Sequence, residues 1–220
     1  MLKSLLNNKF FAFLKLIRVG NLIMIGLTLF LVRYFILRKI LVSNDFELAI
    51  NQYLFGLIVL STVIIAAAGY IINDYFDVKT DKINRPETVV IDVTIKRRWA
   101  MILHIVFNAI GLMLGFYLAL KCHSIKLLAF QILSILLLWF YSTHFKKQLL
   151  VGNIVVSLLT ATIPLMPMVY EYYLIGGINS LTSFLIGDFL KTLVIIVLGY
   201  SAFAFLTSFA REVIKDMEDY

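Results

Sequence analysis

Residues 58–86 read IVLSTVIIAAAGYIINDYFDVKTDKINRP. The first half, 58–72, is apolar enough to lie in lipid, and the second half, 73–86, holds the densest group of acidic and amide side chains in the chain. A bilayer-spanning helix needs roughly 17–25 mostly apolar residues, and runs of this kind recur along the sequence. They predict six transmembrane helices, near residues 18–40, 52–73, 99–120, 124–142, 149–170 and 190–210.

Composition places the chain among polytopic membrane proteins. Of its 220 residues, 61% are hydrophobic and 15% are charged, and the mean hydropathy is +0.94. Soluble domains average about 45–50% apolar and about 25% charged residues. The expected fold class is therefore an all-α transmembrane bundle, formed by one domain over residues 1–220. The single cysteine, Cys122, excludes an intramolecular disulfide.

The net charge of +7 comes from basic residues spread over the loops between apolar spans. Membrane topology and lipid head groups explain this distribution, and no nucleic-acid partner is expected. Most Lys and Arg residues fall at the N-terminus, in the second and fourth loops and at the C-terminus, which the positive-inside rule places in the cytoplasm. The basic start lacks a small-residue cleavage site, so a retained anchor is expected.

Three features of the spans carry local expectations. Arg33 falls inside the first span, where its side chain is expected to snorkel toward the membrane surface. Pro164 and Pro167 are expected to kink the fifth span. Segment 171–188, with two adjacent glycines, is expected to be a loop with an interfacial stretch.

Oxygen-bearing side chains recur at helical spacing in the second half of the 58–86 stretch. They are Asn73, Asp74, Asp77, Asp81 and Asn84. Because successive helical residues are rotated by about 100°, all five fall within an arc of about 100° on one helix face. Pro86 disfavours helical geometry in the residue before it, so the helix should end at residue 84 or 85. A face of carboxylates and amides suits Mg²⁺, and a solvated loop capping a transmembrane helix is the alternative.

A second acidic group, REVIKDMED (211–219), follows the last span. On a helix, Glu212, Asp216 and Asp219 share one face, with Lys215 beside them. Two such helix ends on one membrane face indicate a binding site for a polyanion whose charge a divalent metal neutralises. A diphosphate with a lipid tail fits, since the tail can stay between helices. A cation transporter or channel is the alternative class, although such proteins more naturally carry acids within their spans.

These residues resemble the motifs of the UbiA family of intramembrane prenyltransferases. Asn73-Asp74-x-x-Asp77-x-x-x-Asp81-x-x-Asn84-Arg85-Pro86 matches that family's first aspartate-rich motif at every fixed position, and Lys215-Asp216-x-x-Asp219 is similar to the start of its second motif, KDxxDxxxD. Arg18-Val19-Gly20-Asn21 resembles the RPxN stretch of the first helix, with Val19 where proline is usual. Tyr141-Ser142 with Lys146 and Gly152-Asn153 resembles the YSxxxK…GN stretch around the fourth loop.

The resemblance implies a bundle of nine transmembrane helices, about six of them present here, around a lipid-open cavity capped by both motifs. It implies Mg²⁺ as cofactor, a prenyl diphosphate as donor and a lipophilic acceptor. The implied metal ligands are Asn73, Asp74, Asp77, Asp81, Glu212, Asp216 and Asp219. Those with an implied catalytic role are Asp77, Asp81, Asp216 and Asp219. The implied substrate-binding residues are Arg18, Asn21, Asn84, Arg85, Tyr141, Lys146 and Lys215.

Two departures from the family pattern qualify these expectations. The sequence ends at Tyr220, before the last Asp of the second motif, so a domain incomplete at its C-terminus is expected, with little or no activity as an isolated chain. Arg211 stands where several subfamilies carry Tyr, and REVIKDMED most resembles the branch that prenylates geranylgeranylglyceryl phosphate for ether lipids. That acceptor is predicted, with an aromatic quinone precursor as the alternative. The expected location is a bacterial or archaeal plasma membrane.

Overall fold

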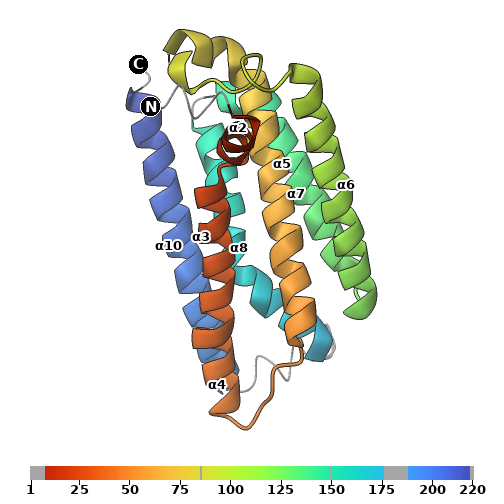
Figure 1. The fold of residues 1–220 in the computed structure, drawn as a ribbon. Helices are drawn as coiled ribbons and strands as arrows, with labels where there is room; N and C mark the ends of the chain where they lie inside the picture. The colour runs from red at the N-terminus through yellow and green to blue at the C-terminus, as the bar shows by residue number, and fades with distance from the viewer. Residues whose placement is uncertain (1–7, 85, 149, 176–187, 219–220) are drawn as a thin grey trace.

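The computed structural model describes residues 8–84, 86–148, 150–175 and 188–218. Within these ranges the chain is helical, apart from connecting loops and an isolated bridge between Ile91 and Ile95. The long helices run along one common direction (Figure 1). Six are long and apolar enough to cross a membrane: Val19–Val42, Gln52–Asn84, Arg97–Lys121, Lys126–Thr143, Val151–Leu174 and Lys191–Met217. The predicted all-α bundle with six spans is confirmed for the described part of the chain.

The first span is preceded by a short helix and contains a change of helix type. α2 (Lys9–Leu16) and α3 (Val19–Leu31) are separated at Arg18, whose φ of 51° breaks the helical path. α3 continues through the π-helical η1 (Val32–Leu37) into α4 (Arg38–Val42). Because of the break at Arg18, α2 is a separate helix and does not continue into the first membrane span.

The second span, α5 (Gln52–Asn84), is 33 residues long. Its first turn is capped by Asn51, whose Oδ1 accepts the Leu54 backbone N–H at 2.8 Å. At 1.5 Å per residue the helix is about 50 Å long, which exceeds the hydrocarbon core of about 30 Å. It ends at Asn84, before the 3₁₀ turn η2 (Pro86–Thr88), where the proline predicted its end. The first aspartate motif therefore lies on a continuous helical extension.

The remaining spans complete two helix pairs. They are α6 (Arg97–Lys121), α7 (Lys126–Thr143), α8 (Val151–Ile175) and α10 (Asp188–Glu218), with the 3₁₀ turn η3 (Phe145–Lys147) between α7 and α8. α5 packs most extensively against α6, and α8 against α10. α3 and α7 each contact both α5 and α8. These two helices therefore join the pairs and bring the ends of α5 and α10 into one bundle.

Glycines allow the close approach of α5 to its neighbours. A Cβ at Gly111 of α6 would lie 2.6 Å from Cγ1 of Ile65, and a Cβ at Gly69 of α5 would lie 2.9 Å from a Leu138 methyl of α7. Gly69 ends the small-residue run that begins at Ala66, and both residues also line the cavity described below. The run thus serves both roles of small residues in membrane bundles, close helix packing and a cavity wall.

α8 carries the two prolines that were expected to kink the fifth span, Pro164 and Pro167. A proline inside a helix lacks an N–H donor and clashes with the preceding turn. Figure 1 shows α8 turning aside in its second half, as these residues predict. The helix continues to Ile175, so the expectation that a loop begins at residue 171 is wrong; residues 176–187 of that segment lie outside the described part.

A buried ionic cluster explains this extension of α8 and corrects a second expectation. Arg33 does not snorkel: it is only 4% exposed, and its guanidinium donates to the Ile50 carbonyl. Glu171, 3% exposed, accepts the backbone N–H groups of Ala49 and Ile50 and interacts electrostatically with Arg33. A buried charge is tolerated when it is paired and hydrogen-bonded. Arg33 therefore stays inside, and Glu171 holds the end of α8 to the loop before α5.

Candidate functional site

The two acidic motifs lie at the same end of the bundle. α5 and α10 both reach this end with their C-terminal turns (Figure 1). The charges of Glu212, Asp77, Arg18 and Asp216 all act on Tyr141 near the end of α7. Charged side chains of both motifs therefore lie close enough to influence one phenol group, which agrees with the expectation that the two helix ends form one site.

The first motif is held by cations from two distant segments. Asn73 Nδ2 donates to Asp77 Oδ2 at 2.9 Å, and Lys146 Nζ from η3 donates to the same oxygen. Arg18 Nη2 pairs with Asp74 Oδ1 at 2.9 Å. Burial by itself lowers the pKa of the Arg18 guanidinium, but the charge and hydrogen bond of Asp74 outweigh it and raise the pKa above its ordinary value. The Arg18 charge is therefore a permanent feature of the site.

The second motif has its own partners on α8 and α10. Asn153 Nδ2, in the first turn of α8, donates to Asp216 Oδ2 at 2.8 Å. The Glu212 carboxylate accepts from Arg211 Nη2 at 2.9 Å, and Lys215 Nζ lies 4.0 Å from its other oxygen. The segment formed by η3 and the start of α8 therefore contacts both motifs, although the two motifs are far apart in the sequence.

The acidic side chains do not converge on one point. Among the residues that the structure describes, no three His, Cys, Asp or Glu side chains are placed to hold a single ion. Asn73 Oδ1 is nevertheless buried without a hydrogen-bond partner, so its lone pairs are available to a cation or a donor. Farther along α5, Asp81 is half-buried and Asn84 is exposed. Arg85 and Asp219 lie outside the described residues.

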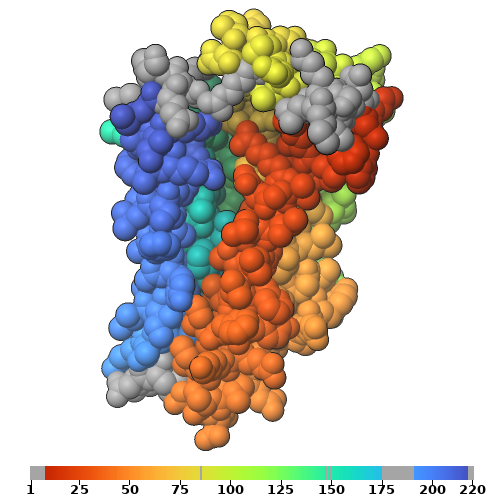
Figure 2. Space-filling view, turned by 60° about the vertical axis from the view of Figure 1, so that its left-hand side comes forward, coloured from red at the N-terminus to blue at the C-terminus, as the bar shows by residue number. Residues whose placement is uncertain are grey.

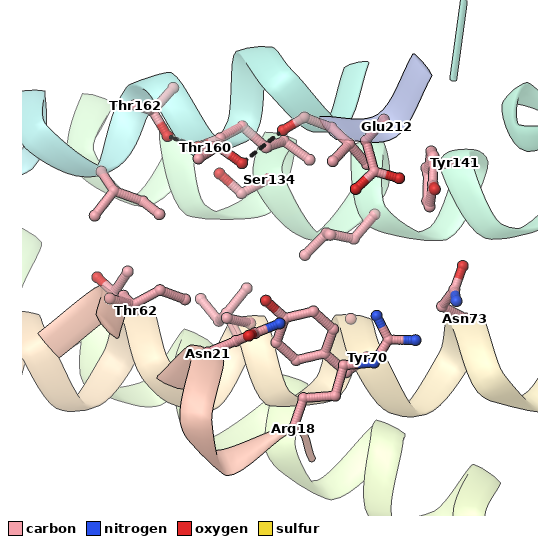
Figure 3. A pocket seen from close by; sticks show the side chains of 18 of the residues that line it. Arg18, Asn21, Thr62, Tyr70, Asn73, Ser134, Tyr141, Thr160, Thr162 and Glu212 are labelled. Atoms are coloured by element: carbon pink, nitrogen blue, oxygen red, sulfur yellow. Dashed lines mark hydrogen bonds between the residues drawn. The ribbon is translucent and has the colours of Figure 1, made fainter. Parts of the chain in front are cut away.

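A cavity of about 610 Å³ lies between α3, α5, α7, α8 and α10. At its polar end, Arg18, Tyr70 and Asn73 lie across the space from Tyr141 and Glu212 (Figure 3). The Arg18 guanidinium carbon lies 5.0 Å from the centre of the Tyr70 ring. The rest of the wall is mainly apolar, and Figure 2 shows a hollow between α3 and α10 with α8 behind it. The cavity therefore joins a charged end to an apolar interior.

Several of the residues implied by the motifs line this cavity. They are Arg18, Asn21, Asn73, Tyr141, Glu212 and Lys215. Asp74 and Asp77 contact lining residues, through Arg18 and Asn73 respectively. The structure thus brings residues of the first and second motifs to one cavity, with Asp74 and Asp77 next to its wall.

The deep part of the cavity holds a polar group that sequence analysis missed. Gln131 of α7 lines the cavity and is only 3% exposed. Its Nε2 donates to Ser61 Oγ at 3.0 Å and to the Tyr170 hydroxyl at 3.1 Å. These three residues lie on three different spans, and Ser61 and Tyr170 are 70 and 39 residues from Gln131. No local spacing indicates that they meet, and only the packing of α5, α7 and α8 brings them together.

Comparison with known proteins agrees with this geometry. The chain is similar to the digeranylgeranylglyceryl phosphate synthase of Methanothermobacter thermautotrophicus, with 35% identity over 171 residues, covering 77% of this chain and 52% of the relative. It is 31% identical over 209 residues to the enzyme of that name from Sulfurisphaera tokodaii, covering 94% of this chain and 64% of the relative. The chain therefore spans about half to just under two thirds of the length of these relatives.

A solved structure and a family model give the same result. The structure, from work on digeranylgeranylglyceryl phosphate synthase in membranes, matches with a TM-score of 0.65 at 25% identity and covers 96% of this chain and 63% of that chain. The model of the UbiA prenyltransferase family matches residues 41–220. Because that match covers most of the sequence, and both motifs meet at one membrane cavity, this protein belongs to the UbiA prenyltransferase family.

Proposed function

We propose that this chain carries the diphosphate-binding part of a prenyltransferase that acts within the membrane. The donor is a prenyl diphosphate, and the acceptor is geranylgeranylglyceryl phosphate. The observation that carries the proposal is one cavity with a charged end at both aspartate motifs and a mainly apolar remainder. The names of the similar proteins support this acceptor over an aromatic one. The distribution of basic loops supports a cytoplasmic position for the N-terminus and both motifs.

The diphosphate would bind at the polar end, where Arg18, Lys146 and Lys215 supply positive charge. The Lys146 ammonium, which donates to Asp77 in the ligand-free protein, would form charge-assisted hydrogen bonds with phosphate oxygens of the donor. The prenyl tail would lie along the apolar wall. That wall extends about 16 Å along α5, from Asn73 to Thr62, at 1.5 Å per residue. The other proposed substrate-binding residues are Asn21, Asn84, Arg85 and Tyr141.

The donor set at the polar end suits Mg²⁺, which prefers carboxylate and amide oxygens and commonly bridges them to phosphates. Asn73 Oδ1 fits such a role because it is buried without a partner, and the Asp77 carboxylate lies beside it. The proposed ligand set is Asn73, Asp74, Asp77, Asp81, Glu212, Asp216 and Asp219. When bound, Mg²⁺ would neutralise charge that develops on the departing diphosphate.

The chain's own residues would supply the rest of the chemistry. Arg18, which its ion pair with Asp74 holds in place, and Lys146 would stabilise the same negative charge. Loss of diphosphate from the donor would leave an allylic cation, and the apolar wall, which includes Ile65, Leu138 and Met166, would keep water away from it. The acceptor hydroxyl would then attack this cation and release its proton to the diphosphate or to solvent. Both effects depend on a site where charge and apolar surface meet within one cavity.

The test is prenyl transfer in membranes that contain the full-length protein. Radiolabelled prenyl diphosphate and geranylgeranylglyceryl phosphate should give a lipid-soluble product that requires Mg²⁺ and is lost in Asp77→Ala. Asp92→Asn is the control, because Asp92 is exposed outside both motifs and pairs only weakly with Lys82 at 3.6 Å, and asparagine keeps its left-handed φ of 68° while removing the charge. Cation flux into vesicles without any product would refute the proposal and support the transporter alternative.

A further inference from the structure

Arg211 is a cation of the cavity wall that does not pair with a carboxylate of the first motif. Arg18 and Lys146 are already held by carboxylates of the first motif. Arg211 lines the cavity from α10 and pairs with the adjacent Glu212 at 2.9 Å. The Arg211 side chain is 67% exposed, whereas that of Glu212 is 8% exposed. The guanidinium is therefore anchored by a buried carboxylate and still open to a ligand.

The position of this pair separates it from the cations on the other side of the cavity. Figure 3 shows Glu212 on the wall opposite Arg18 and Asn73. The proposed reaction must bring two anionic heads to this end, a diphosphate and a phosphate monoester, and like charges at close range repel each other. The diphosphate takes Arg18, Lys146 and Lys215 as its cations, and Arg211 on α10 is left to neutralise the second anion.

Resting on the proposed function, we infer that Arg211 binds the phosphate group of the glyceryl phosphate acceptor. A guanidinium presents a planar fork of donors that matches a phosphate, and this pairing favours phosphate over neutral groups. Glu212 accepts from one nitrogen of the guanidinium, and the side chain is exposed enough for its other N–H groups to donate to a ligand. Arg211 therefore selects a phosphorylated acceptor, since a neutral aromatic acceptor has no group that uses this charge.

The test compares two charge-removing variants, Arg211→Gln on α10 and Lys146→Gln on the first-motif side, in membranes with the full-length protein. The KM for the glyceryl phosphate acceptor and the Mg²⁺-dependent Kd for prenyl diphosphate are measured for each. Loss of a hydrogen bond between charged groups should raise the acceptor KM of Arg211→Gln about 10- to 100-fold, with the donor Kd unchanged. Lys146→Gln should do the reverse. Arg211→Lys, which keeps charge without the fork, should be intermediate.

A dephosphorylated acceptor, geranylgeranylglycerol, distinguishes phosphate binding from general damage. The wild type should use it poorly, and Arg211→Gln should use it as well as the wild type does. The inference is overturned if Arg211→Gln leaves the acceptor KM unchanged, or if it weakens donor binding as much as Lys146→Gln does. If the wild type transfers prenyl groups only to an aromatic acceptor, the proposed function fails as well, and that outcome is visible before any variant is made.

Discussion

Asn153 is the side chain through which the first turn of α8 positions an aspartate of the second motif. Its Nδ2 donates to Asp216 Oδ2 at 2.8 Å, and the residue is only 8% exposed. Its backbone carbonyl accepts a hydrogen bond from Ser157 Oγ, which an alanine at position 153 would retain. Asn153→Ala therefore removes one contact to the motif and leaves the start of α8 in place.

The size of the effect follows from that single hydrogen bond. A hydrogen bond to a charged group contributes about 1.5–3 kcal/mol. Groups that orient metal ligands typically change metal affinity about 10- to 100-fold when they are removed. We therefore expect the Mg²⁺ concentration for half-maximal prenyl diphosphate binding to rise about 10- to 100-fold. The cost to folding should be smaller, because alanine favours the helix and the freed carboxylate at this end can reach water.

The assay measures prenyl diphosphate binding to the purified protein in lipid nanodiscs by isothermal titration calorimetry, at a series of Mg²⁺ concentrations. Asn108→Ala is the matched control, because Asn108 is a half-buried amide on α6 that lies 3.1 Å from a ring nitrogen of His104. It should leave the titration unchanged. A titration of Asn153→Ala that matches the wild type, in a protein with wild-type thermal stability, would refute a positioning role for Asn153.

Three further predictions concern stability and metal. Glu171→Ala removes the acceptor of the Ala49 and Ile50 N–H groups and the negative charge near the buried Arg33. The free energy of unfolding should therefore fall by about 3–5 kcal/mol. An unchanged melting temperature in detergent would contradict this. Gly115→Ala places a Cβ in a steric clash with Gln131 Oε1, and overpacking of this kind lowers the free energy of unfolding by about 1–3 kcal/mol. In a protein that already carries Gln131→Ala, the added effect of Gly115→Ala should be small, and additive losses in denaturation would count against the clash. Chelation by EDTA should abolish prenyl diphosphate binding and added Mg²⁺ should restore it, measured by the same calorimetry; binding that survives chelation would show that the cations of the chain suffice.

The sequence by itself determined the membrane class, the number of spans in the described chain and the end of α5. These properties are local: the cost of placing polar backbone and side chains in lipid forces long apolar helices, and a proline restricts the residue before it. The shared helix face of the motif residues could also be predicted, because a helix repeats every 3.6 residues and side chains at that spacing lie on one face.

Only the tertiary structure decided which side chains meet. Arg18 and Asp74 are 56 residues apart, and Lys146 and Asp77 are 69 apart, so no window of sequence contains both members of either pair. The same holds for Gln131 and its partners Ser61 and Tyr170, which are 70 and 39 residues from it. The inward position of Arg33 also depends on a distant partner, because a charge stays buried only where packing supplies a counter-charge and hydrogen bonds.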